Sequence, residues 1–178
     1  MPGVSTYTCP ECGLDYDTIS PLDGVVAIRT FPRRYRSALA AAMEDESDEG
    51  IVRRRPQPDV WSALEYTAHV VDILSAHATF VREMRTKDDP TLDAPQEGHF
   101  DAISRGGGSI EAAIAHLTTA ATSLADELDK VASAEWHRTA QFPWGERDLL
   151  ITMRNAVHEG SHHLRDVEKV LGQVRGRS

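Results

Sequence analysis

The stretch that decides the fold runs from residue 62 to residue 85 and reads SALEYTAHVVDILSAHATFVREMR. Ser62 followed by Glu65 forms a capping box, in which each side chain accepts a hydrogen bond from a backbone N–H at the start of a helix. Apolar residues then recur every three or four positions, the period of one helix face: Leu64, Ala68, Val71, Leu74, Ala78 and Val81. The stretch therefore predicts an amphipathic helix from residue 62 to about residue 85.

Two later stretches have the same helical period. Ser109 caps a predicted helix over residues 110–128. The last predicted helix runs from about Glu146 to Leu171 and stops at Gly172. Its apolar face consists of Leu150, Met153, Val157, Gly160, Leu164, Val167 and Leu171.

The first helical stretch, between residues 21 and 43, contains Pro32. A proline lacks the backbone N–H that a helix interior uses, and its ring clashes with the preceding turn. We expect a short turn or helix before Pro32 and a proper helix that starts near it. With the three helices that follow, the sequence predicts an all-α protein, a four-helix bundle.

The connections between the predicted helices are long. We expect a loop from Glu44 to Asp59, a long crossover loop over residues 86–108 between helices 2 and 3, and a loop over residues 131–145. We expect no strands. The predicted division is a CxxC extension over residues 1–20 and a bundle over residues 21–172. Three aromatic residues of the last loop could line a pocket mouth, although such residues more often pack over the bundle end: Trp136, Phe142 and Trp144.

Composition and charge exclude several classes of protein. A length of 178 residues suits one domain, and the net charge of −9 argues against a nucleic-acid partner. The basic runs at residues 33–36 and 53–55 are short, and acidic residues lie between them, which is typical of solvated faces.

No stretch approaches the roughly 20 apolar residues that span a bilayer, and the first residues lack a secretory core. We expect a cytoplasmic protein without a membrane partner, and a homodimer is among the oligomeric states that the sequence allows.

The main chemical signal is HEGSHH at residues 158–163. Side chains four apart on a helix stack on one face, so His158 can pair with His162, and Glu159 with His163. At about 100° per residue, Glu159 and His163 lie at the border of the apolar face, whereas His158 and His162 face solvent. We therefore favour Glu159 and His163 as metal ligands and keep His158 and His162 as the alternative register. The other interpretation is that these are surface residues without a metal.

A catalytic ion usually takes three protein ligands, so one more must come from another helix. The candidates are the remaining histidines: His69, His77, His99, His116 and His137. His69 lies at the border of the apolar face of its helix. His77 lies nearer the middle of that face, where a core histidine with one hydrogen bond is the simpler interpretation. Periodicity alone does not select His69 over His77.

Two motifs resemble those of a known family, the DinB-like superfamily. Residues 61–72, WSALEYTAHVVD, look like its second-helix motif, which places a metal-binding histidine at His69. Residues 158–167, HEGSHHLRDV, look like its fourth-helix motif. The two motifs occur in the family's order, and the resemblance covers about residues 21–171. It implies a metal-binding four-helix bundle.

The resemblance also implies a ligand set and a chemistry. The ion would be zinc, nickel or a similar divalent metal, bound by His69, His163 and either Glu159 or His158. The Glu-x-x-x-His version resembles the mycothiol-dependent maleylpyruvate isomerases. Several members of the superfamily are S-transferases that use mycothiol or bacillithiol, whose thiol pKa the metal lowers. This sequence lacks a recognisable thiol-cofactor motif, so the resemblance does not name a substrate.

Cys9 and Cys12 form one CxxC, the half of a zinc knuckle, and no second CxxC exists. Three interpretations remain open. The pair belongs to a zinc knuckle completed by His or Asp or by a second subunit, it is a redox pair, or it is a remnant without metal.

The resulting functional hypothesis is a metal-dependent thiol S-transferase that acts on a small electrophile. Asp72 or His162 would orient one of the ligands. One alternative is a metal-dependent hydrolase, with Glu65 or a metal-free Glu159 as the base. The other is a metal-binding stress or interaction protein without turnover. All three need the same ligands.

Overall fold

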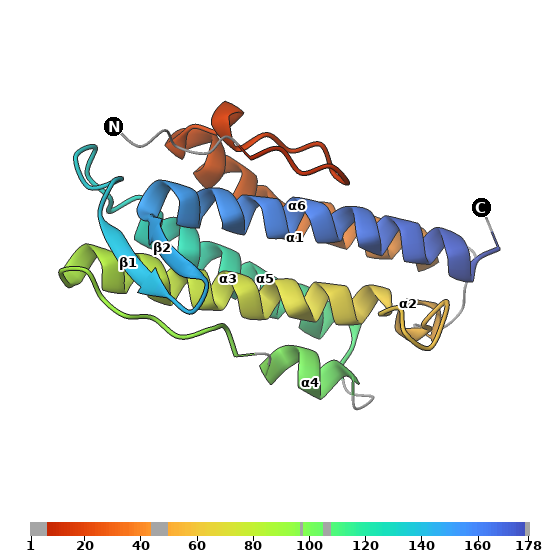
Figure 1. Cartoon of the computed structure of the whole chain (residues 1–178). Helices are drawn as coiled ribbons and strands as arrows, with labels where there is room; N and C mark the ends of the chain where they lie inside the picture. The colour runs from red at the N-terminus through yellow and green to blue at the C-terminus, as the bar shows by residue number, and fades with distance from the viewer. Residues whose placement is uncertain (1–6, 44–49, 97, 105–107, 177–178) are drawn as a thin grey trace.

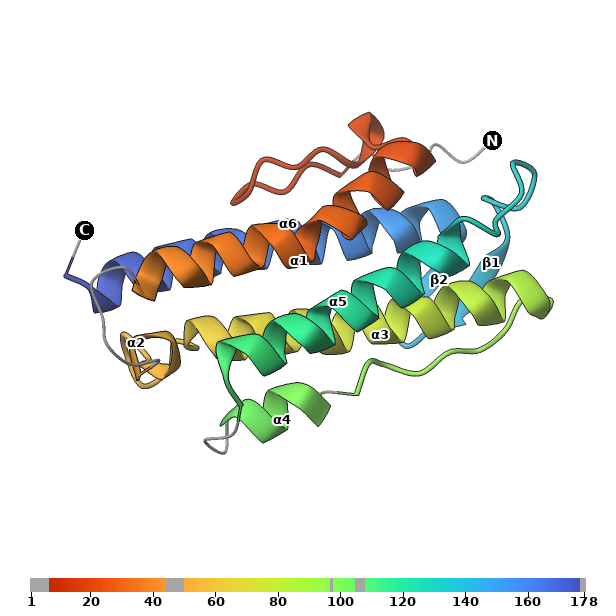
Figure 2. The same ribbon diagram turned by 180° about the vertical axis from the view of Figure 1, so that it is seen from behind.

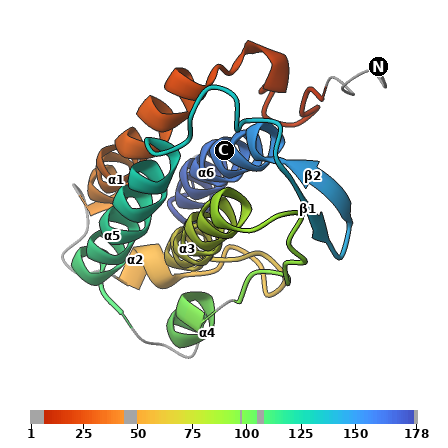
Figure 3. The ribbon, with the colours of Figure 1, turned by 90° about the vertical axis from the view of Figure 1, so that its left-hand side faces the viewer.

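The computed structural model of the chain describes residues 7–43, 50–96, 98–104 and 108–176, and its frame is a bundle of four long helices (Figure 1). The helices are α1 (Pro21–Met43), α3 (Ala63–Thr86), α5 (Ile110–Leu128) and α6 (Leu149–Val174). Viewed end-on, α1 packs between α5 and α6, and α3 packs between the same two helices on the opposite side (Figure 3). The predicted fold class, an all-α four-helix bundle, is confirmed.

The order and direction of the helices match the predicted crossover. Helices α3 and α5 run in the same direction, opposite to α1 and α6 (Figures 1 and 2). The chain must therefore return along the whole bundle between α3 and α5. That return contains the short helix α4 (Gly98–Ser104), which the sequence analysis placed within a loop.

Two more small elements lie where loops were expected. Helix α2 (Gly50–Arg53) buries Ile51 and Val52, although Glu44 to Asp59 was predicted to be a loop throughout. The expectation that the chain has no strands is wrong as well. Strands β1 (Thr139–Phe142) and β2 (Gly145–Asp148) form an antiparallel hairpin beside the start of α6. Elements of four residues are too short to show a period, which is why sequence reasoning missed them.

Helix α1 is continuous through Pro32, so the predicted break there is wrong. A proline inside a helix costs about 3 kcal/mol. Ile28, Phe31 and Tyr35 lie on the core side of the same turns and are fully buried. Burial of each such side chain contributes roughly 1.5–3 kcal/mol, and only a continuous helix places all three in the core.

The limits of α6 also differ from the predicted range of residues 146–171. Asp148, the last residue of β2, caps the helix: its Oδ1 accepts a hydrogen bond from the backbone N–H of Ile151 at 2.8 Å. Gly172 lies inside the helix, which ends at Val174. A helical glycine costs about 1 kcal/mol relative to alanine, and buried Val170 and Leu171 hold this turn against the core.

Residues 7–20 lie along the outside of the bundle, beside α1 and α6 (Figures 1 and 3). They include a short 3-10 helix, η1 (Tyr16–Thr18). The Nε of Arg154 on α6 donates to the carbonyl of Ile19 at 3.1 Å, and the Nδ2 of Asn155 donates to the hydroxyl of Tyr16 at 3.4 Å. These contacts place the extension directly over one face of α6. Among the described helices, none combines the length and apolar character that a membrane span requires.

Candidate metal centre

Three side chains on two neighbouring helices converge on one point. His69 comes from α3, and Glu159 and His163 come from α6. Each offers one donor atom, and the three donors all lie within 4.8 Å of one another. The Nε2 of His163 is 3.4 Å from Oε2 of Glu159, and the rings of His69 and His163 are 5.0 Å apart. The structure thus brings together the three residues that the sequence analysis selected; their binding of a metal stays a prediction.

Local structure explains why these three meet. The predicted capping box is present: the hydroxyl of Ser62 accepts from the backbone N–H of Glu65, whose carboxylate accepts from the backbone N–H of Ser62. This cap fixes where α3 begins, and His69 follows two turns later on the side that faces α6. Glu159 and His163 are four residues apart, so they stack on one face of α6.

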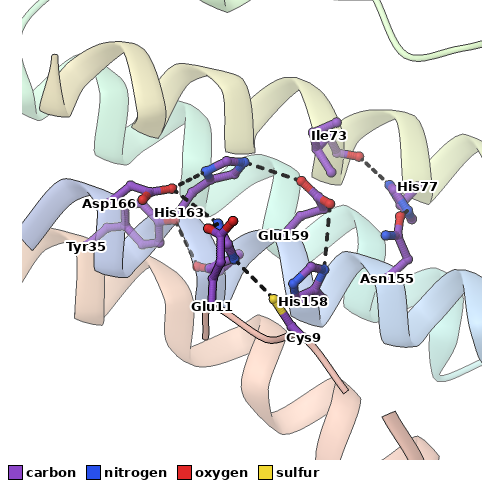
Figure 4. A network of polar contacts seen from close by, with 12 residues as sticks. Cys9, Glu11, Tyr35, Ile73, His77, Asn155, His158, Glu159, His163 and Asp166 are labelled. Atoms are coloured by element: carbon purple, nitrogen blue, oxygen red, sulfur yellow. Dashed lines mark hydrogen bonds and ion pairs between the residues drawn. The ribbon is translucent and has the colours of Figure 1, made fainter. Parts of the chain in front are cut away.

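A carboxylate holds the ring of His163. Oδ2 of Asp166 accepts from Nδ1 of His163 at 2.8 Å, which leaves Nε2 directed toward Glu159 (Figure 4). Burial alone would lower the pKa of His163, but Asp166 and Glu159 outweigh it and raise the pKa to about 9. Burial raises the pKa of Glu159, and the nearby histidines, His163 first, outweigh it and lower that pKa overall. The centre is therefore built to hold positive charge next to the Glu159 carboxylate.

Aromatic rings pack around the two histidines. The rings of Trp61 and His69 are 5.2 Å apart, and those of Tyr66 and His163 are 5.4 Å apart. Trp61 also packs against Phe100 of α4, with ring centroids 4.5 Å apart. These contacts restrict the rotation of both imidazoles, so the donor atoms keep their mutual positions.

A cavity of about 910 Å³ adjoins the centre, and its wall includes Glu159 but neither His69 nor His163. His158 forms part of the same wall. The opposite walls come from the N-terminal extension and from the β-hairpin, which contribute Tyr7, Tyr16, Phe142 and Trp144. Of the three aromatic residues for which the sequence allowed a pocket mouth or packing over the bundle end, Phe142 and Trp144 line this cavity. Their rings stack on each other, with centroids 5.3 Å apart. The centre therefore adjoins a space large enough for small molecules.

The other histidine candidates lie elsewhere. His77 is buried: its Nδ1 lies 2.8 Å from the carbonyl of Ile73 and its Nε2 lies 3.1 Å from Oδ1 of Asn155. Burial lowers its pKa, as expected for a core histidine. His99 and His116 pack against each other, and His137 lies beside the N-cap of α6.

Asp72 and Glu65, which the sequence analysis considered as an orienting residue and as a base, have other contacts in the structure. The carboxylate of Asp72 accepts from the backbone N–H groups of His99 and Phe100 and so anchors α4. Asp166, rather than Asp72 or His162, orients a candidate ligand. Glu65, considered as a base for a hydrolase, accepts a hydrogen bond from Nε of Arg55 at 2.8 Å besides forming the capping box.

The alternative register, His158 and His162, does not face solvent as expected. Their side chains are only 12% and 20% exposed, because the N-terminal extension covers this face of α6. One donor from each lies within 4.8 Å of donors from Cys9 and Cys12. The two pairs of side chains on α6, Glu159 with His163 and His158 with His162, therefore belong to two different clusters.

The sequence model of the DinB superfamily matches residues 31–167, and the chain belongs to this superfamily. Among solved structures it is similar to YfiT from Bacillus subtilis, described as "a probable metal-dependent hydrolase with an unusual four-helix bundle topology". The TM-score is 0.76 over 98% of this chain and 97% of that one, at 13% sequence identity. At that identity the likeness establishes the fold. No curated protein matches the sequence.

Proposed function

We propose that this protein is a divalent-metal-dependent enzyme of the thiol S-transferase type that acts on a small electrophile. The ion would be zinc or nickel, held by His69, Glu159 and His163. The observation that carries the proposal is the convergence of their three donors beside a cavity that Glu159 itself lines. We place the reaction in the cytoplasm, where low-molecular-weight thiols are kept reduced.

The donor set suits such an ion. Two imidazole nitrogens and one carboxylate oxygen form a common ligand set of catalytic zinc, and imidazole also binds nickel well. Three protein ligands leave room for a further ligand from a substrate. Asp166 accepts the Nδ1 proton of His163, so the proton on Nε2 is the one that a bound ion would displace.

In this proposal a thiol is the activated group. A bound divalent ion would lower the pKa of a coordinating thiol enough to hold it as the nucleophilic thiolate. Such an ion also lowers the pKa of bound water, often with help from a carboxylate base. The carboxylates of Glu65 and Asp166 are engaged, the first by Arg55 and the second by His163. Glu146 and Asp148 also line the cavity, so a hydrolase stays the second candidate.

The cavity walls fit two small reactants. Tyr7, Tyr16, Phe142 and Trp144 provide aromatic surface for the electrophile. Arg147 of β2 also lines the cavity, and its guanidinium can pair with a carboxylate of either reactant.

A metal-dependent hydrolase is the second candidate, because YfiT, whose fold this chain shares, is described as a probable enzyme of that kind. The hydrolase would use the same ligands. The two candidates differ in whether a thiol binds at the centre.

A thermal-shift screen tests the proposal. Mycothiol, bacillithiol, glutathione and cysteine are each added to protein loaded with zinc or nickel. A thiol at 100 times its dissociation constant stabilises the folded state by about 2.7 kcal/mol. We expect one thiol to raise the melting temperature of the wild type and of the control His116→Ala, which changes an exposed histidine, but not that of His69→Ala.

Turnover then separates the candidates. With the stabilising thiol, transfer to monochlorobimane should depend on the loaded metal and be lost in His69→Ala. Metal-dependent ester or amide hydrolysis without any thiol effect would support the hydrolase instead. Metal binding with neither activity would leave a non-catalytic metal-binding protein and overturn the proposal.

A further inference from the structure

The second donor cluster begins in the N-terminal extension, where residues 7–16 form a tight knuckle. Thr8 and Asp15 pair as an antiparallel bridge, and the backbone N–H of Gly13 donates to the carbonyl of Cys9 at 2.8 Å. Gly13 has a φ of 71°, a conformation that glycine adopts without steric cost. The turn holds Cys9 and Cys12 close together, and both cysteines are buried and reduced.

The knuckle lies against His158 and His162 of α6. These two histidines are one helical turn apart and project from the same face. The Sγ of Cys9 lies 3.7 Å from Nδ1 of His162, and Figure 4 shows this sulfur beside His158. One donor from each of Cys9, Cys12, His158 and His162 lies within 4.8 Å of the others.

We propose that Cys9, Cys12, His158 and His162 bind a second metal ion, a structural zinc ion, which fastens the N-terminal extension to α6. Two thiolates and two imidazoles form a closed, four-ligand set, the usual composition of structural zinc sites. The spacings agree, since the cysteines are separated by two residues and the histidines by three.

The contacts of both histidines fit this role. Nε2 of His158 is buried and has no hydrogen-bond partner among the described residues. A buried polar atom without a partner is costly, and a bound ion would satisfy it. His162 directs Nδ1 toward Cys9, while its Nε2 lies 3.4 Å from a carboxylate oxygen of Glu11. Zinc-binding histidines commonly use one ring nitrogen for the metal and the other for a carboxylate.

This ion has a consequence for the cavity beside the first centre. Buried Tyr16 and Ile19 already attach the second half of the extension to the bundle. The metal would add an attachment at Cys9 and Cys12, and its binding energy is then folding energy. Tyr7 and Tyr16 of the extension form one wall of that cavity. His158, one of the four proposed ligands, also lines the cavity. Loss of the zinc would loosen the part of the wall that Tyr7 forms, so we expect the second ion to influence the shape of the cavity.

Metal analysis of the purified full chain tests the second site. We expect about two ions per chain when zinc is supplied, one in each centre. Cys9→Ser, His158→Ala and His162→Ala should each lose one ion and keep the other, whereas His69→Ala should lose the other one. His116→Ala, an exposed histidine of α5, is the matched control and should keep both. Far-ultraviolet circular dichroism establishes that each variant remains helical.

Cobalt substitution of the wild type gives a second measurement that needs no variant. Cys9 and Cys12 are the only cysteines in the chain, so a thiolate-to-cobalt charge-transfer band can come from this site alone. We expect that band, and we expect both thiols to react slowly with Ellman's reagent until a chelator removes the metal. The absence of the band, a disulfide between the cysteines in the purified protein, or retention of both ions in His158→Ala and His162→Ala would overturn the proposal.

Discussion

Oδ2 of Asp166 lies 2.8 Å from Nδ1 of His163 and 3.7 Å from Nε2 of His162, so one carboxylate contacts a histidine of each cluster on α6. The shorter contact is a hydrogen bond that sets the tautomer and direction of His163. The first prediction follows from this relationship.

Asp166→Asn should weaken metal binding at the centre of His69, Glu159 and His163. An asparagine cannot hold His163 with the same charge-assisted bond, and loss of such a partner typically costs 10-fold to 100-fold in metal affinity. Competition with a chelating dye measures the dissociation constant. Glu168→Gln removes the same charge from an exposed position of α6 and serves as the control. Equal affinities in the two variants would show that Asp166 does not position His163.

The second prediction concerns the register of ligands on α6. Glu159→Ala and His163→Ala should each weaken metal binding at the first centre, by about 10-fold or more. His158→Ala should leave that centre's affinity close to the wild-type value, because its side chain belongs to the cluster with Cys9. The same dye competition measures the dissociation constant of the first centre in each variant. The amount of metal bound at the second site is determined beforehand. The reverse ranking would mean that the first centre uses the other face of the helix.

The helices and the first cluster could be predicted because their signals are local. The capping box of Ser62 and Glu65 marks where α3 begins, and the apolar stripe of α6 gives the face on which Glu159 and His163 lie. No local sequence signal selects His69 over His77 as the third ligand. The choice of His69 came from a resemblance to the DinB-like superfamily, and the family match supports that resemblance.

The second cluster could not be predicted in the same way. The apolar stripe of α6 shows what that helix buries against the bundle, but not that residues 7–16 cover its outer face. His158 and His162 therefore looked solvent-exposed. Three residues separate the two histidines and two residues separate Cys9 from Cys12, and both spacings occur in zinc sites. The two pairs, however, lie near opposite ends of the chain. Only the position of the extension joins them.

The third prediction tests the close approach of α1 and α6. Gly160 follows His158 and Glu159 and precedes His162 and His163, and a Cβ there would be 2.3 Å from Cε2 of Phe31, which is fully buried. The hydroxyl of Tyr35 also donates to the carbonyl of Gly160 at 2.9 Å. Gly160→Ala should lower the free energy of unfolding by about 1–3 kcal/mol through overpacking, measured by urea denaturation.

The same substitution should also disturb the metal centres, because α6 or the ring of Phe31 must shift to accommodate the methyl group. We expect weaker metal binding at Glu159 and His163 on either side of it. Gly98→Ala is the matched control, since a Cβ at Gly98 meets no atom within 4 Å. If Gly160→Ala were as stable as this control, the helices would not be in contact at Gly160.

The last prediction is a pH dependence that arises from His77. Burial lowers the pKa of His77 in the folded protein below its ordinary value of about 6.5. As the pH falls below about 6.5, the unfolded chain binds a proton at this residue that the folded chain does not. The free energy of unfolding should therefore fall with pH, by at most about 1.4 kcal/mol per pH unit from this group. His163, whose pKa is raised to about 9, has the opposite effect: its contribution to stability is complete below about pH 6.5 and is lost as the pH rises toward 9. This contribution is the same in the wild type and in a variant of His77.

His77→Gln isolates the contribution. Glutamine keeps a polar side chain near the carbonyl of Ile73 and the amide of Asn155 but does not titrate. Urea denaturation of the metal-free protein between pH 7.5 and pH 5.5 gives the slope for wild type and variant. The wild type should lose more stability than the variant as the pH falls across this range, whatever the difference between them at pH 7.5. Parallel slopes would show that His77 takes up its proton equally well in the folded protein, and that burial between α3 and α6 does not hold it neutral.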